Sequence, residues 1–137
     1  MLHHMMLGDL LSDIIQIDDI LIIVRTEGAI IEMRSNSLNL RQKDKWITIG
    51  ENDGPCHMHI DASMINEVRF IKEQKTDRIS HSLRFFDKSG EKQFSTVFAK
   101  MYDKEMNLNL ERKKLYDDLF EKYGSHEIIK FNFEPSN

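Results

Sequence analysis

Apolar and polar residues alternate with a period of two along much of this chain, which is the pattern of half-buried β-strands. The clearest runs are ILIIVR at 20–25, WITI at 46–49, VRFIK at 68–72, ISHSLRFFD at 79–87 and QFSTVFA at 93–99. Turn residues separate these runs, as in GENDGP at 50–55 and DKSG at 87–90. The pattern therefore predicts antiparallel strands joined by short turns.

Two segments near the ends of the chain repeat with a period of 3.6 instead. Between Met5 and Ile17, leucine and isoleucine recur at positions 7, 10, 11, 14 and 15, which predicts a short, acidic amphipathic helix. Between Lys104 and Tyr123, leucine, tyrosine and phenylalanine form an apolar stripe that predicts a second helix, and Gly124 would end it. The alternating run IIKFNF at 128–133 predicts an edge strand, in this chain or in a partner.

Together these elements predict an α+β fold. An antiparallel meander of about six to eight strands would be covered on one face by an N-terminal and a C-terminal helix. The length of 137 residues is that of one domain, so we expect a single domain over 1–137.

Composition narrows the classes of function. The net charge is −4, which provides no global basic field, so we expect neither nucleic acid nor an anionic membrane as partner. Cys56 is the one cysteine, which fits a reducing compartment. No apolar run is long enough to span a bilayer, and the first residues are acidic where a secretory signal would be basic. We therefore expect a cytoplasmic protein without membrane insertion.

Three histidines on the predicted meander are candidate ligands. His57 and His59 are two residues apart in CHMHID, so their side chains would leave a strand on the same face and could approach one metal ion or cofactor. His81 lies on the strand at 79–87. The alternative, which stays open, is that these are half-buried strand histidines that hydrogen-bond to neighbours.

Cations also concentrate on the meander, although the whole chain is acidic. They are Arg69, Lys72, Lys75, Arg78 and Arg84. Guanidinium groups suit carboxylates or phosphates, whereas a solvated, charged sheet edge is the alternative interpretation. No catalytic residue is predicted, because the chain contains no G-x-S-x-G elbow, P-loop or dinucleotide glycine motif.

The central segments resemble a known family. WITIG, CHMHIDASMINEVRFI and ISHSLRFFDKSGEKQFSTVF, preceded by ILIIVRTEGAIIEMR, are similar to the repeated unit of the haem-utilisation family of HemS, ChuX and HutX. The likeness covers a core unit at about 20–123. In HemS-type proteins a histidine-containing segment follows this hairpin, and it has no match here, since His126 is the one histidine downstream of His81.

The resemblance implies a cytoplasmic haem-binding protein for haem storage, delivery or iron utilisation. HemS-type proteins carry two copies of the unit, so one copy implies a homodimer. Haem offers an apolar macrocycle, an iron that takes axial ligands and two propionates. The resemblance assigns the haem site to six residues, His57, His59 and His81 near the iron, with His59 and His81 as metal ligands, and Arg69, Lys72 and Arg84 near the propionates.

Two alternatives remain open at this point. The first is an enzyme, either a haem-degrading protein or a metal-dependent hydrolase that uses His57 and His59. The second is a dimerising module that keeps the fold without a ligand.

Overall fold

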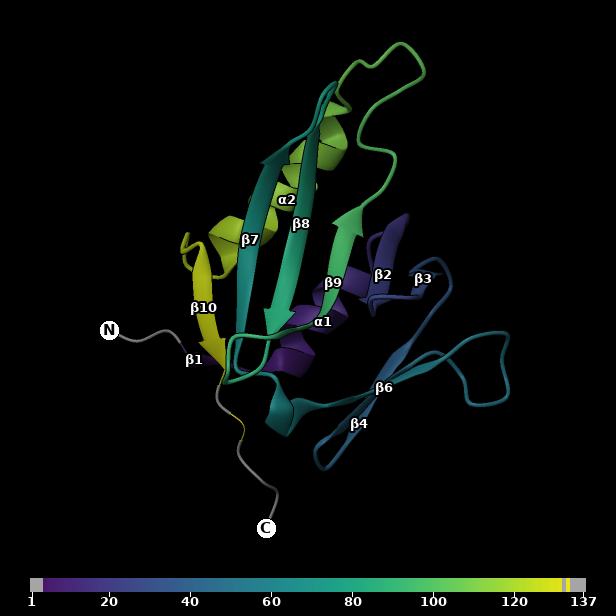
Figure 1. The fold of residues 1–137 in the computed structure, drawn as a ribbon, viewed down its shortest axis with the longest axis vertical. Helices are drawn as coiled ribbons and strands as arrows, with labels where there is room; N and C mark the ends of the chain where they lie inside the picture. Colours follow the sequence, from purple (N-terminus) through teal and green to yellow (C-terminus); the bar gives the residue numbers. More distant parts are fainter. Residues whose placement is uncertain (1–3, 132, 134–137) are drawn as a thin grey trace.

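Seven strands form one large sheet in the computed structural model, which describes residues 4–131 and 133. Their order is β1-β10-β7-β8-β9-β2-β3 (Figure 1). The bounds are β1 His4–Met5, β2 Ile20–Arg25, β3 Ile30–Arg34, β7 Glu67–Gln74, β8 Ile79–Phe86, β9 Lys92–Phe98 and β10 Ile128–Phe131. All neighbours pair antiparallel except β1 and β10, which are parallel. The predicted α+β fold with an antiparallel sheet is confirmed.

A second, three-stranded sheet was not anticipated. It contains β4 (Leu40–Lys43), β5 (Trp46–Ile49) and β6 (Met58–Asp61) in that order. The sequence predicts strands in this part of the chain, but not that they leave the main sheet. The separation follows from the end of β6, where the Asp61 side chain accepts a hydrogen bond from the Ser63 N–H at 3.0 Å. This bond caps the 3-10 turn η1 (Ala62–Met64), which redirects the chain before β7.

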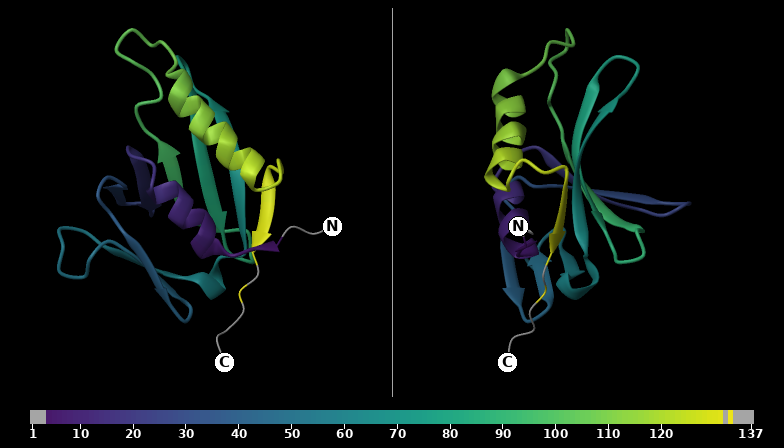
Figure 2. Two further views of the ribbon diagram at one scale, coloured as in Figure 1. Left: turned by 180° about the vertical axis from the view of Figure 1, so that it is seen from behind. Right: turned by 90° about the vertical axis from the view of Figure 1, so that its left-hand side faces the viewer.

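Both helices pack on the same face of the large sheet (Figure 2). Helix α1 (Leu7–Ile15) buries all five of its predicted apolar positions. Helix α2 (Leu110–Lys122) places Tyr116 and Phe120 against Phe70 of β7, with ring centroids 5.9 Å and 5.4 Å apart. Since side chains alternate along a strand, Arg69 and Glu73 of β7 point to the opposite face, which no helix covers. No helix within the described residues has the length and apolar character needed to cross a membrane.

Helix α2 begins later than the periodicity predicts. The expected start was Lys104, but the helix starts at Leu110, because the Asn109 side chain accepts a hydrogen bond from the Arg112 N–H at 3.1 Å. Upstream, the Asp103 carboxylate accepts the N–H groups of Glu105 and Asn107 at 2.9 Å and 2.8 Å and folds the chain into a turn. Residues 99–109 therefore form a connection that passes beside the start of β8 instead of an additional helical turn.

The position of the helix start can be tested by replacing Asn109. Asn109→Ala removes the cap and should lower the free energy of unfolding by about 1 kcal/mol in urea titrations. Asn107→Ala, a matched control in the connection, should change it by less than about 0.5 kcal/mol. A helix that ran from Lys104 would instead be stabilised by both replacements, since alanine is the better helix former.

Candidate functional site

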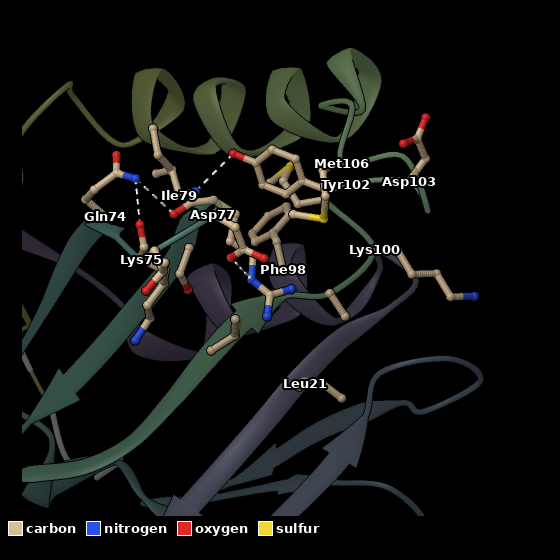
Figure 3. A pocket seen from close by; sticks show the side chains of 16 residues that line it. Leu21, Gln74, Lys75, Asp77, Ile79, Phe98, Lys100, Tyr102, Asp103 and Met106 are labelled. Atoms are coloured by element: carbon tan, nitrogen blue, oxygen red, sulfur yellow. Dashed lines mark hydrogen bonds and ion pairs between the residues drawn. The ribbon is translucent and has the colours of Figure 1, made fainter.

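A cavity of about 910 Å³ lies between the β7–β8 hairpin and the connection that leaves β9 (Figure 3). We call it the hairpin cavity. Its lining comes from residues 74–80 of the hairpin, residues 97–103 with Met106, and Leu21 of β2. This volume is in the range of small-molecule and cofactor sites. The cavity exists because the connection is not helical here, which the late start of α2 allows.

The wall of the hairpin cavity combines apolar and polar side chains in similar proportion. Phe98 and Met101 form its buried part, each 4% exposed, whereas Ile79 and Met106 present 38% and 39% of their surface to solvent. The Tyr102 hydroxyl oxygen accepts a hydrogen bond from the Ile79 N–H at 3.0 Å and so ties the connection to the start of β8 (Figure 3). Exposed apolar side chains around a concavity are characteristic of ligand sites.

Three cations line the same cavity, and each has a carboxylate partner. Arg78 lies 3.7 Å from Asp77, Lys100 lies 3.5 Å from Asp19, and Lys75 pairs with Glu73. The three cationic side chains are half or more exposed, and ion pairs of this kind contribute little to stability. The exposed cationic groups could therefore also pair with an anionic ligand.

A smaller hollow of about 380 Å³ adjoins the cavity on the uncovered face of the large sheet. We call it the open-face groove, and it shares Lys75, Ser80 and Val97 with the hairpin cavity. Arg84 lines this groove and donates to Glu73 at 2.7 Å. Hydrogen bonds from Lys75 and Arg84 lower the pKa of Glu73 to about 2. Glu73 is thus ionised near neutral pH and offsets the positive charge of both cations.

The structure places His81 in the core and not in either hollow. Its side chain is 3% exposed, and its ring lies 5.1 Å from that of Tyr116, edge to face. The His81 Nδ1 atom lies 3.1 Å from the Ile79 carbonyl oxygen, to which it donates as a neutral imidazole. Burial lowers the pKa of His81, although the bond to Ile79 acts in the opposite sense. Lys72 pairs with His81 across the strands and lies 3.5 Å from Asp117 of α2.

His57 and His59 lie on the small sheet and its approach, where both are exposed. Their ring centroids are 5.2 Å apart, and the His59 Nδ1 atom is 2.9 Å from the Thr48 hydroxyl oxygen. They and His81 belong to different sheets, so the three predicted imidazoles are not brought together. No group of three or more histidine, cysteine, aspartate or glutamate side chains within the described residues is arranged to hold a metal ion.

The predicted arginines share the uncovered face of the sheet. Arg69 and Arg84 are directly opposite each other in the β7–β8 register. Arg69 lies outside the open-face groove, donates to Glu67 at 2.6 Å and covers the Phe86 ring at 4.3 Å. Burial raises the pKa of Glu67, but hydrogen bonds from Lys130 and Arg69 outweigh this, and the net pKa is lowered. Arg69 therefore serves a structural ion pair, whereas Arg84 reaches a hollow.

The sequence offers Tyr102 and the methionines as sources of iron-ligating atoms, but its interpretation does not include Tyr102 or Met106 among the site residues. Both belong to the connection, of which the second half was assigned to a helix, and neither lies on an alternating strand. The signal was present in Asp103 and Asn109, since these residue types favour turns and helix caps.

Comparisons with known proteins agree with this architecture. A protein-family model matches residues 8–124. A crystal structure of ChuX superposes with a TM-score of 0.72 at 17% identity, covering 87% of this chain and 75% of ChuX. Another structure, of the haem-binding protein ChuX, superposes with a TM-score of 0.71 at 15% identity and covers 85% of this chain and 71% of that protein. Holo-PhuS, a haem-binding protein from Pseudomonas aeruginosa, gives 0.65 at 20% identity, covering 81% of this chain and 31% of PhuS. A search of curated proteins finds no significant match.

The burial of His81 predicts a pH dependence of stability. The folded chain keeps His81 neutral because burial lowers its pKa, whereas the unfolded chain takes up a proton near the ordinary value of about 6.5. The unfolded state then binds more protons, so the free energy of unfolding should fall as the pH drops from about 7.5 to about 5.

This pH slope should be shallower in His81→Phe, as measured by urea unfolding at a series of pH values. The exposed His57→Phe variant is the matched control and should behave like the unaltered chain. Equal slopes for His81→Phe and the unaltered chain would contradict the assignment of a buried neutral imidazole.

Proposed function

Because this chain belongs to the ChuX/HemS-like haem-utilisation family, we propose that it binds haem and that the hairpin cavity receives the macrocycle. The observation that carries the proposal is the make-up of this cavity, in which apolar side chains lie beside three cations in a volume of about 910 Å³. The relatives in fold, ChuX and PhuS, are described as haem-binding proteins, which supports the same class of ligand here.

The residues of the cavity fit the chemistry of haem. The group supplies a flat apolar ring, two propionates and an iron that takes axial donors. Ile79 and Met106, the exposed apolar side chains of the cavity, would contact the ring, and their exclusion of water would contribute to the affinity. Arg78 would pair with a propionate, since its present partner Asp77 is exposed and the ion pair is easily exchanged. Lys75 would be the second cation for the propionates, in addition to its pairing with Glu73.

Several finer features are part of the proposal. We propose a role in haem storage, delivery or iron utilisation, a cytoplasmic location, a single domain over 1–137 and a homodimer. Arg84 lines the open-face groove, which adjoins the cavity through Lys75, Ser80 and Val97, and we propose it as a propionate contact. The roles of Arg69 and Lys72 at propionates, and of His57, His59 and His81 at iron, stay predictions that depend on the family resemblance.

Titration with hemin tests the proposal directly. The purified protein should shift and sharpen the hemin Soret band at stoichiometric ratio. Arg78→Glu should weaken the affinity by about three- to tenfold, because it reverses one charge at the rim of the cavity. Lys43→Glu makes the same charge change on β4, outside both hollows, and should leave the affinity unchanged.

Two results decide the outcome. A hemin spectrum that does not change on adding the protein would contradict the proposal and favour a module that keeps the fold without this ligand. His59→Ala and His81→Ala, titrated in parallel, test the histidine predictions, since a Soret shift that weakens in either variant would support histidine ligation.

A further inference from the structure

Among the residues lining the hairpin cavity, few side chains are of the types that ligate haem iron. Haem proteins use histidine, cysteine, methionine or tyrosine as axial ligands. The lining contains no histidine and no cysteine, and it contains Tyr102, Met101 and Met106. Met101 is 4% exposed and belongs to the packed wall. The open donors in the cavity are therefore the phenol of Tyr102 and the thioether of Met106.

The hydrogen bond of Tyr102 distinguishes it from the other tyrosines. The chain has three tyrosines, all among the described residues. The Tyr116 hydroxyl donates to the Ser82 carbonyl oxygen, and the Tyr123 hydroxyl donates to Asp13. The Tyr102 oxygen instead accepts the Ile79 N–H at 3.0 Å. A phenolate oxygen can accept this N–H and bind ferric iron at the same time, because it keeps lone pairs for both.

The surroundings of Tyr102 support the same role. Lys75, Arg78 and Lys100 line the cavity together with the carboxylates of Asp77 and Asp103, so cations outnumber carboxylates in its lining. The connection that carries Tyr102 is fixed by backbone pairing with Leu108 and by a hydrogen bond from the Asn109 N–H to the Met101 carbonyl at 2.8 Å. A donor held on a fixed segment loses little conformational entropy when it binds a ligand.

We propose that Tyr102 is the axial ligand of haem in this chain, bound through its phenol oxygen. This inference rests on the proposed function, and it identifies the residue and the donor atom that bind the iron. It also implies a preference for ferric over ferrous haem, because an anionic oxygen is a hard donor. The connection thus supplies the ligand that the sequence-based interpretation sought among the histidines.

The test compares Tyr102→Phe with Tyr123→Phe. Both remove one hydroxyl, but Tyr123 lies between α1 and α2 on the covered face, away from the cavity. The unaltered chain loaded with hemin should show the visible charge-transfer absorption of ferric tyrosinate and the enhanced tyrosinate vibrations in resonance Raman spectra. Tyr102→Phe should lose both signatures and bind hemin at least about tenfold more weakly. Tyr123→Phe should keep them.

The outcomes separate this inference from the proposed function. No Soret change in the unaltered chain would contradict the proposed function itself. Hemin binding with the same spectrum and affinity in Tyr102→Phe would overturn Tyr102 as ligand and leave haem binding intact. Tyr102→Phe without hemin should match the unaltered chain without hemin in its circular dichroism spectrum and thermal unfolding. Loss of the tyrosinate signatures in such a folded variant would support Tyr102 as the ligand.

Discussion

The packing of Tyr116 against the large sheet is the interaction on which the rest of the structure depends. Its ring meets those of Phe70, His81 and Phe98 edge to face at 5.9, 5.1 and 5.4 Å, and its hydroxyl donates to the Ser82 carbonyl oxygen at 3.1 Å. One side chain of α2 thereby contacts three neighbouring strands. Because α2 packs on this face, it leaves the opposite face and the tip of the β7–β8 hairpin uncovered. The open-face groove lies on that opposite face, and the hairpin cavity lies beside the tip.

Arg112 links this packing to the cavity. Its guanidinium donates to the carbonyl oxygens of Ala99 and Asp19 at 2.9 Å and 3.0 Å, so the start of α2 is bound to the chain as it leaves β9. Burial lowers the pKa of Arg112, although the group stays charged at any ordinary pH. The connection that carries Tyr102 and Met106 is therefore held at both of its ends, by Ala99 and by the cap at Asn109. A fixed connection keeps the cavity open without a ligand.

Period-two alternation predicted most strands of the large sheet, because a one-residue slip would expose the whole core face, and the helical stripes completed the fold class. The two-residue strand β1 was not predicted. The alternation also placed His81 on the same face as Leu83 and Phe85, so its burial follows from the sequence. Alternation cannot tell which strands share a sheet, and the small sheet was missed for that reason. Leu108 has the spacing of the apolar stripe of α2, so the sequence predicts a helix that includes it. The late start of α2, and with it the cavity, could not be predicted for that reason. The site combines residues 21, 74–80 and 97–106, a proximity that only the folded chain creates.

The central claim, that haem occupies the hairpin cavity, is tested most directly by mapping amide signals of isotope-labelled protein by NMR as ferric haem is added. Paramagnetic iron broadens nearby amides most strongly. The account predicts that broadening concentrates at residues 74–80 and 97–106 and spares the small sheet around His57 and His59. Broadening centred on the small sheet, or no selective broadening at stoichiometric haem, would contradict it.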